Sequence, residues 1–381
     1  IDFDNCKIID DTTFTIVTKE PTANQLALLS NAFTGIFSKS DFKAKNGNFF
    51  QNIAGTGPYI LDSYVEGDHY TLASYDGYWD NSIAGRIKKL NFRVITEGAN
   101  RAIESETGGA DIVYDITAND KERIKSATNL QYLYAYSANS NYVCLNTAKP
   151  PLDDIRVRQA IMYGIDRKTV EEMAYKGMGK LPNTFFNEDI IGSADISNQL
   201  LGRDVEKAKH LLAEAGYSNG LTIEFAAESN QPMRMDVAEA VQAQLADIGV
   251  TVKLNFMDAN AYSSYTAGGN HNLCIYGLSA STGEAGNGLM RFTPEMSYYT
   301  LTSHNNKEVL QKINEGLHTI NEAKRIQLFE EAQRGLMDVY CVLPIWSKEI
   351  NAAAANYVDM TDFYLDRSYE THLLTGVRFK F

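Results

Sequence analysis

NYVCLNTAKPPLDDIRVRQAIMYGIDR, residues Asn141 to Arg167, is the stretch that decides the fold. It opens with an apolar, strand-like segment around Cys144, which predicts a buried strand and a buried free thiol. Pro150 and Pro151 end that strand, since proline has no N–H to donate. Two acidic residues then introduce a run with helical periodicity, as expected at the positive end of a helix dipole. The stretch therefore predicts a strand followed by a helix.

The sequence after Arg167 again predicts alternating helices and strands. DVEKAKHLLAEAG, from Asp204, predicts a helix that ends at Gly216, because glycine readily adopts the left-handed conformation of a helix C-terminus. A strand at Leu221–Ala226, a helix at Met235–Ile248 and a strand at Val250–Phe256 come next. Strand, helix and strand in this order predict a βαβ unit and a partly parallel sheet.

The first third of the chain is richer in strands. Thr12–Thr18, Tyr70–Ser74 and Leu90–Ile95 combine β-branched and aromatic residues, which predicts three strands. Asn100–Gly108 and Asp120–Ala127 predict short helices. Toward the other end of the chain, the sequence again alternates between a helical and a strand-like pattern.

Composition excludes several classes of protein. The 381 residues are too many for one ordinary hydrophobic core, so two domains are expected. With 44% hydrophobic and 22% charged residues the bulk of the chain is globular, and no run of about eighteen apolar residues occurs. The formal charge is −13 and no basic cluster interrupts it, which argues against nucleic acid as a partner.

The sequence contains no complete motif of the common enzyme, metal or nucleotide-binding classes. GxSxG and HExxH are absent, and the glycine pair at Gly55 and Gly57 is followed by proline, which a dinucleotide-binding turn does not tolerate. The four cysteines form no CxxC, so a zinc ribbon and a thioredoxin-type motif are excluded. We expect no enzyme activity, no metal and no cofactor.

Five segments together resemble the family 5 extracellular solute-binding proteins, and the resemblance covers nearly the whole chain. The opening stretch, Asn141 to Arg167, is similar to the family pattern YLxFNTxKPPFDDxRVRQAIxYAIDR almost letter for letter. Four further blocks resemble the family in the right order: Gly55 to Asp80 (GTGPYILDSYVEGDHYTLASYDGYWD), Phe92 to Ile116, Asp204 to Gly220 and Ala238 to Leu254.

The resemblance implies an α/β fold of the two-lobed, periplasmic-binding-protein type II class, with a mixed sheet in each lobe. Residues 1–140 would form the remainder of lobe I, 141–345 lobe II, and 346–381 a return crossover with a C-terminal tail on lobe I. The chain starts at KIIDDTTFTI, which resembles a strand inside lobe I of the family. We therefore expect lobe I to be incomplete, either through truncation or because its opening part is a separate chain.

The implied function is that of an extracytoplasmic receptor. It would close on a small peptide or similar solute by hinge bending and deliver it to the membrane permease of an ABC importer. Alternative solutes within the family are glutathione, a nickel chelate and a sugar-like molecule, and a sensor domain that reuses the fold is a further alternative. We expect a periplasmic or cell-surface location, with a membrane contact only through a lipid anchor upstream of Ile1.

The resemblance also selects candidate ligand-binding residues, foremost in Ser279–Asn287 (SASTGEAGN). Peptide binders of the family carry an aspartate here for the peptide amino terminus, and Ser281 stands at the matching position. Ser279 and Thr282 are further candidates in the same segment. Glu284 could supply the negative partner or merely cap a helix. Nickel-type members carry a histidine in this segment and this chain has none, which disfavours a metal chelate.

Two other regions supply the remaining candidates. In Glu228–Arg234 (ESNQPMR), Asn230 and Arg234 are predicted to contact the ligand, although dipeptide binders place their carboxylate-binding arginine closer to the strand. Bidentate capture of a carboxylate requires a guanidinium, so this displacement argues against free dipeptides. Near the crossovers the candidates are Asn139, Asn141, Tyr142 and Trp346. Backbone-satisfied polar groups and interlobe packing remain the alternatives for them.

Overall fold

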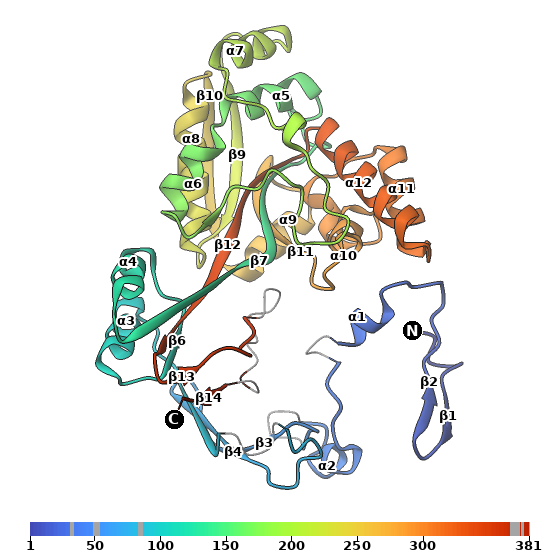
Figure 1. Ribbon diagram of the computed structural model, residues 1–381. Coiled ribbons are helices and arrows are strands. Elements are labelled where there is room, and N and C mark those ends of the chain that lie inside the picture. Colours follow the sequence, from blue (N-terminus) through green and yellow to red (C-terminus); the bar gives the residue numbers. More distant parts are fainter. Residues whose placement is uncertain (31–33, 49–53, 83–86, 366–373, 375–376, 381) are drawn as a thin grey trace. The chain divides into compact units, whose positions relative to one another are not determined.

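The chain forms two compact units in a computed structural model that describes residues 1–30, 34–48, 54–82, 87–365, 374 and 377–380 (Figure 1). The larger unit comprises Ile1–Leu28 and Tyr136–Lys348, and the smaller unit comprises Leu29–Ala135 and Glu349–Phe381. Part of the predicted C-terminal tail on lobe I, namely 366–373, 375–376 and 381, lies outside the described residues.

The larger unit is built on a mixed sheet. Its principal strands are β7 (Leu130–Leu145), β9 (Leu221–Glu228), β10 (Val250–Met257), β11 (Leu273–Ser279) and β12 (Val342–Ala355), with the short β8 (Gly179–Lys180) on β12. They follow the order β10-β9-β11-β7-β12. β9 runs parallel to both β10 and β11, whereas β11 runs antiparallel to β7. The predicted α/β class and the βαβ unit are thus confirmed.

Helices cover both faces of this sheet, as Figure 1 shows for α6 and α8 on one side and α11 and α12 on the other. The helices of the larger unit are α5 (Ile155–Gly164), α6 (Arg167–Tyr175), α7 (Val205–Glu214), α8 (Pro232–Ala246), α9 (Ala259–Ala267), α10 (Ala285–Leu289), α11 (Lys307–His318) and α12 (Glu322–Asp338), and its 3₁₀ turns are η3 (Ser197–Gln199), η4 (Met290–Phe292) and η5 (Ser297–Leu301).

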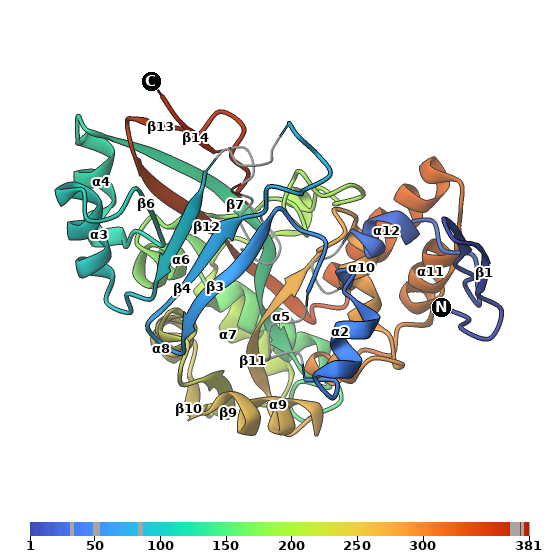
Figure 2. The same cartoon turned by 90° about the horizontal axis from the view of Figure 1, so that it is seen from below.

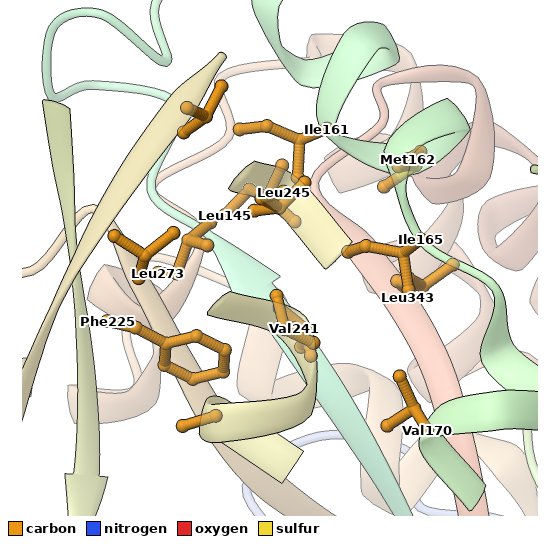
Figure 3. Close-up of a cluster of buried hydrophobic side chains, with 14 of the residues drawn as sticks. Leu145, Ile161, Met162, Ile165, Val170, Phe225, Val241, Leu245, Leu273 and Leu343 are labelled. Atoms are coloured by element: carbon orange, nitrogen blue, oxygen red, sulfur yellow. The ribbon is translucent and has the colours of Figure 1, made fainter. Parts of the chain in front are cut away.

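Alternation along the strands divides the interior into two cores. Val143 and Leu145 face the helices α5 to α8, in the cluster that Figure 3 draws, whereas Tyr142 and Cys144 face α9 to α12. Because side chains alternate across a strand, a sheet covered on both faces needs apolar residues at nearly every position. Cys144 is buried as a free thiol, as predicted, and lies opposite the equally buried Cys274.

Capping residues fix the helices that follow the deciding stretch. Asp154 is the N-cap of α5 and accepts a hydrogen bond from the backbone N–H of Arg156, with which it also forms an ion pair. Asp166 caps α6 in the same way. Arg158, in contrast, is buried and donates to the carbonyls of Val339 and Leu152. These charged residues of the family motif therefore have structural roles.

The smaller unit contains short elements. They are α2 (Lys39–Ala44), β3 (Tyr59–Val65), β4 (His69–Ser74), β5 (Lys89–Arg93), α3 (Gly98–Thr107), β6 (Ile112–Tyr114), α4 (Ala118–Ser126), β13 (Val358–Asp359) and β14 (Arg378–Phe379). β3, β4 and β5 form one antiparallel sheet, in which β3 and β4 lie side by side in Figure 2. β6 pairs antiparallel with the end of β12.

The points at which the chain passes from one unit to the other lie inside strands and a helix, not in loops. One passage, at Ala135/Tyr136, lies within β7, and another, at Lys348/Glu349, lies within β12. A third follows Leu28, inside α1 (Gln25–Leu29).

The grouping of the N-terminal residues differs from the expected one, because Ile1–Leu28 belongs to the larger unit rather than to lobe I. Its strands β1 (Lys7–Asp10) and β2 (Thr13–Thr15) pair with each other, and Glu20 lines a pocket together with Gln311 and Lys324 of the larger unit. Among the described residues, no helix has both the length and the apolar character that crossing a membrane requires.

His304 makes the stability of the larger unit dependent on pH. Its side chain is fully buried, Nε2 donates to the carbonyl of Phe292, and Nδ1 has no hydrogen-bond partner within the part of the chain that the structure describes. Burial lowers the pKa of His304 from 6.5 to about 4. Between these two values the unfolded chain binds a proton that the folded chain does not. Stability should therefore fall by about 3 kcal/mol from pH 6.5 to pH 4, and remain unaffected by this group above pH 6.5.

The prediction is checked with urea unfolding midpoints at pH 7.5 and 4.5 for the wild type and for His304→Gln. Glutamine can still donate to the Phe292 carbonyl but does not titrate. The contribution of the carboxylates cancels in the comparison, so the variant should lose less stability on acidification. Equal losses in the two proteins would show that His304 does not carry the effect.

Candidate functional site

A pocket of about 340 Å³ opens at the carboxyl ends of β9 and β11 in the larger unit. Its lining includes the charged residues Glu228 and Arg234 and three tyrosines, Tyr262, Tyr276 and Tyr298. Open α/β sheets bind ligands outside the carboxyl ends of their strands, and the position of this pocket follows that rule. We take it as the candidate site.

Local sequence explains how these side chains reach the pocket. Glu228 is the last residue of β9, and Pro232 starts α8 four residues later, a position at which its fixed φ suits a helix. Arg234 consequently lies in the first turn of α8. Asp258 caps α9 through the N–H groups of Asn260 and Ala261, which sets that helix against the other side of the pocket.

Glu228 and Arg234 form an ion pair inside the pocket. Nη1 of Arg234 donates to Oε2 of Glu228 over 2.8 Å, and the side chains keep 22% and 15% of their surface exposed, respectively. The guanidinium also lies over the ring of Tyr276, 6.0 Å from its centre. The pair is therefore largely withdrawn from water yet still accessible to a ligand.

Two tyrosines and a second arginine extend this arrangement. The rings of Tyr276 and Tyr298 lie 5.1 Å apart, and the guanidinium of Arg291 lies 4.7 Å from the centre of the Tyr298 ring. The pKa of Tyr298 is lowered because its hydroxyl interacts with that of Tyr276 and because Arg291 is positively charged. Burial, followed by the same hydroxyl interaction, raises the pKa of Tyr276.

Strand pairing brings Asn141 to the same place. Asn141 lies opposite Gly277 in the antiparallel pair of β7 and β11. A Cβ atom at Gly277 would lie 3.3 Å from Oδ1 of Asn141 and 3.5 Å from Nη2 of Arg234. Two of the predicted residues, Asn141 and Arg234, thus converge on one glycine. Asn230 lies exposed ahead of α8.

Most of the predicted polar residues in Ser279–Asn287 lie beyond the end of β11. Ser279 is opposite Asn139, and Ser281 donates from Oγ to Oδ1 of Asn287 over 2.9 Å. The buried hydroxyl oxygens of Ser279 and Thr282 have no hydrogen-bond partner among the described residues. Buried hydroxyls without partners are costly, so both remain candidates for contact with a ligand or an ordered water.

Glu284 has a structural partner that neither predicted alternative included. Its Oε1 accepts a hydrogen bond from Nε of Arg325 over 2.8 Å, and both side chains are buried. Glu284 occupies the N-cap position of α10 but makes no capping bond with its side chain. Glu284 thus stands at a helix start, as one of the predicted alternatives has it, but its carboxylate neutralises a buried guanidinium instead of bonding to the helix N–H groups. A contact of Glu284 with a ligand stays a prediction.

Two predicted aromatic contacts belong to the cores instead. Tyr142 is fully buried, packs on Phe185 and donates its hydroxyl to the Phe185 carbonyl. Trp346 is 2% exposed and stacks on Tyr175 with ring centres 3.6 Å apart. Both assignments to the ligand surface are corrected, since each ring is enclosed by its neighbours within the larger unit.

Tyr276 and Tyr298 were not among the predicted site residues. Tyr276 lies two residues beyond Cys274 in a strand that the sequence indicates only as apolar and buried. Tyr298 lies in η5, outside every segment that resembles the family closely. The high tyrosine content, 22 residues, was the available signal, and it does not select particular positions.

The described residues offer no group of three or more His, Cys, Asp or Glu side chains that could hold a metal ion. The pocket instead combines an ion pair, phenol hydroxyls and aromatic faces, a set that suits reversible binding of a polar organic group.

Comparison with known proteins identifies the family. The model of the bacterial extracellular solute-binding proteins, family 5 Middle, matches residues 2–298, and the chain belongs to this family. A glutathione-binding protein from Salmonella typhimurium is 26% identical over 86% of the chain, and heme-binding protein A from Haemophilus influenzae is 28% identical over 85%. The chain spans 65% and 61%, respectively, of these relatives' lengths.

Solved structures agree on the fold. HbpA2 from Haemophilus parasuis aligns with a TM-score of 0.85 and 23% identity over 99% of this chain and 75% of its own. A dipeptide-binding protein from Pseudoalteromonas in complex with Met-Leu aligns with a TM-score of 0.81 and 22% identity, over 98% of this chain and 75% of its own. The predicted resemblance and the type II, two-lobed fold class are therefore confirmed.

Proposed function

We propose that this chain is the receptor of an ABC importer, which captures a small peptide or related solute between two lobes and delivers it to the permease. Membership of the family over residues 2–298 is the observation that carries the proposal. The polar pocket at the ends of β9 and β11 supports it, because binding sites in α/β folds occupy that edge.

The proposal includes a location and a motion. We place the protein outside the cytoplasm, as a periplasmic or cell-surface lipoprotein, with the smaller unit as lobe I and the larger unit, which includes Ile1–Leu28, as lobe II. Closure would bend the backbone near the passages within β7 and β12, since a hinge needs only a few residues that absorb rotation. Catalysis is not part of the proposed function.

The test is mass spectrometry of the small molecules released when the protein, purified from its own cells without refolding, is denatured. A peptide or peptide-like solute present in about one equivalent is the expected result. A single non-peptide molecule would keep the receptor role and replace the solute class by one of the alternatives, such as a metal chelate or a sugar. Absence of any solute, together with failure to bind a peptide library, would refute the receptor role.

A further inference from the structure

Two cysteines lie directly opposite each other in the sheet of the larger unit. Cys144 of β7 and Cys274 of β11 are partners in the antiparallel register of these strands. Both belong to the core that α9 to α12 cover, so their side chains lie on the same face of the sheet. Both are fully buried and both are free thiols. The proposed receptor function uses neither of them.

The spacing of the two strands suits a covalent bond between these residues. Residues directly opposite each other in an antiparallel pair have Cα atoms about 4.5–5.5 Å apart, and disulfides join cysteines whose Cα atoms are about 4.4–6.8 Å apart. The two thiol groups already interact with each other. A disulfide between them therefore needs side-chain rotation but no change in the strand register.

The surroundings of Cys274 favour its thiolate form. Nε2 of His271 donates to the carbonyl of Leu301 over 3.1 Å, which leaves Nδ1 able to accept a proton and without a hydrogen bond in the described part of the chain. Burial alone would raise the pKa of Cys274, but its contacts with Cys144 and His271 lower it. Contact with Cys274, and then burial, raise the pKa of Cys144. One thiol of the pair is thus the nucleophile, since the thiolate is the reactive form.

We propose that Cys144 and Cys274 form a dithiol that hydrogen peroxide converts to a cross-strand disulfide. Cys274 passes its proton to His271, and its thiolate attacks one oxygen of the peroxide to form a sulfenic acid. The other oxygen leaves as hydroxide, which takes the proton back and becomes water. The sulfur of Cys144 then attacks the sulfenic sulfur, and its proton leaves with the hydroxyl group as a second water. Two thiols lose two electrons, and one peroxide is reduced to two waters.

The candidate pocket lies next to this pair. Tyr262 lines the pocket and interacts with the Cys274 thiol, and Leu301, whose carbonyl holds His271, lines the pocket as well. Hydrogen peroxide is uncharged and close to water in size, so it can reach a buried thiol that larger oxidants cannot. The inference goes beyond the proposed receptor function and does not depend on it. The proposed location outside the cytoplasm is one in which disulfides persist.

The bond would fasten β7 to β11. The chain passes between the two units within β7, and β11 carries Tyr276 and Gly277 to the pocket. A covalent link between the strands would fix the register that places Asn141 opposite Gly277. A disulfide that closes a long loop restricts the unfolded chain, so the oxidised protein should be the more stable form.

Peptide mapping of the purified, reduced chain before and after treatment with hydrogen peroxide tests the proposal. The treated wild type should contain one linked peptide pair that joins Cys144 to Cys274, and neither residue should be alkylated after unfolding. The urea midpoint should rise by about 1 M or more on oxidation. Reduction with dithiothreitol in urea, followed by refolding, should reverse both changes.

Cysteine variants assign the effect to this pair. C144A and C274A should show neither the linked peptides nor the rise in midpoint. Each variant is compared with itself before and after oxidation, so a loss of stability caused by the substitution cancels. C341A is the matched control, because Cys341 is equally buried but its Sγ donates to the carbonyl of Leu336. This variant should form the same disulfide as the wild type.

Three results would overturn the inference. In the first, peroxide that oxidises the partly buried Cys6 leaves Cys144 and Cys274 open to alkylation after unfolding. In the second, Cys144 is linked to Cys341 instead. In the third, Cys274 accumulates as sulfinic acid while Cys144 stays a free thiol, which would place the second sulfur out of reach. Solute binding is measured separately, so none of these results bears on the receptor function.

Discussion

Replacing Glu284 by alanine is expected to reduce the free energy of unfolding by about 3–5 kcal/mol, because the change leaves a buried guanidinium without its carboxylate. Arg325 is held by Glu284 on one side and by the carbonyls of Thr319 and Ile320 on the other. The carbonyls satisfy its hydrogens but not its charge. The loss should appear as a lower urea midpoint with an unchanged slope.

Matched variants separate this effect from a role in binding. Glu330 forms a partly exposed pair with Arg334 one helical turn away, and Glu330→Ala should change stability by less than about 1 kcal/mol. The double variant E284A/R325M should recover part of the loss, since it removes both charges. If Glu284→Ala were as stable as the wild type but bound solute poorly, the carboxylate would be a ligand contact after all.

Local sequence signals accounted for much of the architecture. The acidic N-caps at Asp154, Asp166 and Asp204 act through neighbouring backbone N–H groups, so a short window contains all the required information. The βαβ unit at β9, α8 and β10 follows from the apolar periodicities of three consecutive segments. The resemblance to the family then supplied the order in which these pieces assemble.

Contacts between residues far apart in the sequence could not be predicted from such local signals. Glu284 and Arg325 are 41 positions apart, and no local pattern links them. Asn141 and Arg234 meet at Gly277 only because β11 pairs antiparallel with β7 in one particular register, and a shift by one residue would turn each side chain to the other face.

Burial on both faces of the sheet explains the errors with aromatic residues. In a strand that is covered on one side, alternation distinguishes inward from outward positions, but β7 and β12 are apolar at successive positions. Tyr142 and Trp346 consequently looked like residues at a crossover that could face a ligand. The structure shows that each contributes a large ring to a core of the larger unit.

Trp346 provides the second test with a large expected effect. Trp346→Ala should reduce the free energy of unfolding by about 3–5 kcal/mol, because it removes a buried ring and leaves a cavity beside Tyr175. The fit around the ring is close: a Cβ atom at Gly179 would lie 1.6 Å from its Nε1 and 2.5 Å from the carbonyl of Ser347. The surroundings therefore cannot easily collapse into the vacated space.

Trp346→Phe is the informative companion variant. It keeps an aromatic ring against Tyr175 and removes the buried Nε1, for which the described residues supply no hydrogen-bond partner. The stability should therefore fall by much less than in the alanine variant. The other tryptophan, Trp79, is 77% exposed, and Trp79→Phe should have little effect. Urea unfolding followed by circular dichroism measures all three. A core role requires that solute affinity remains unchanged in Trp346→Phe, whereas a platform beneath the ligand would lose affinity with little change in stability.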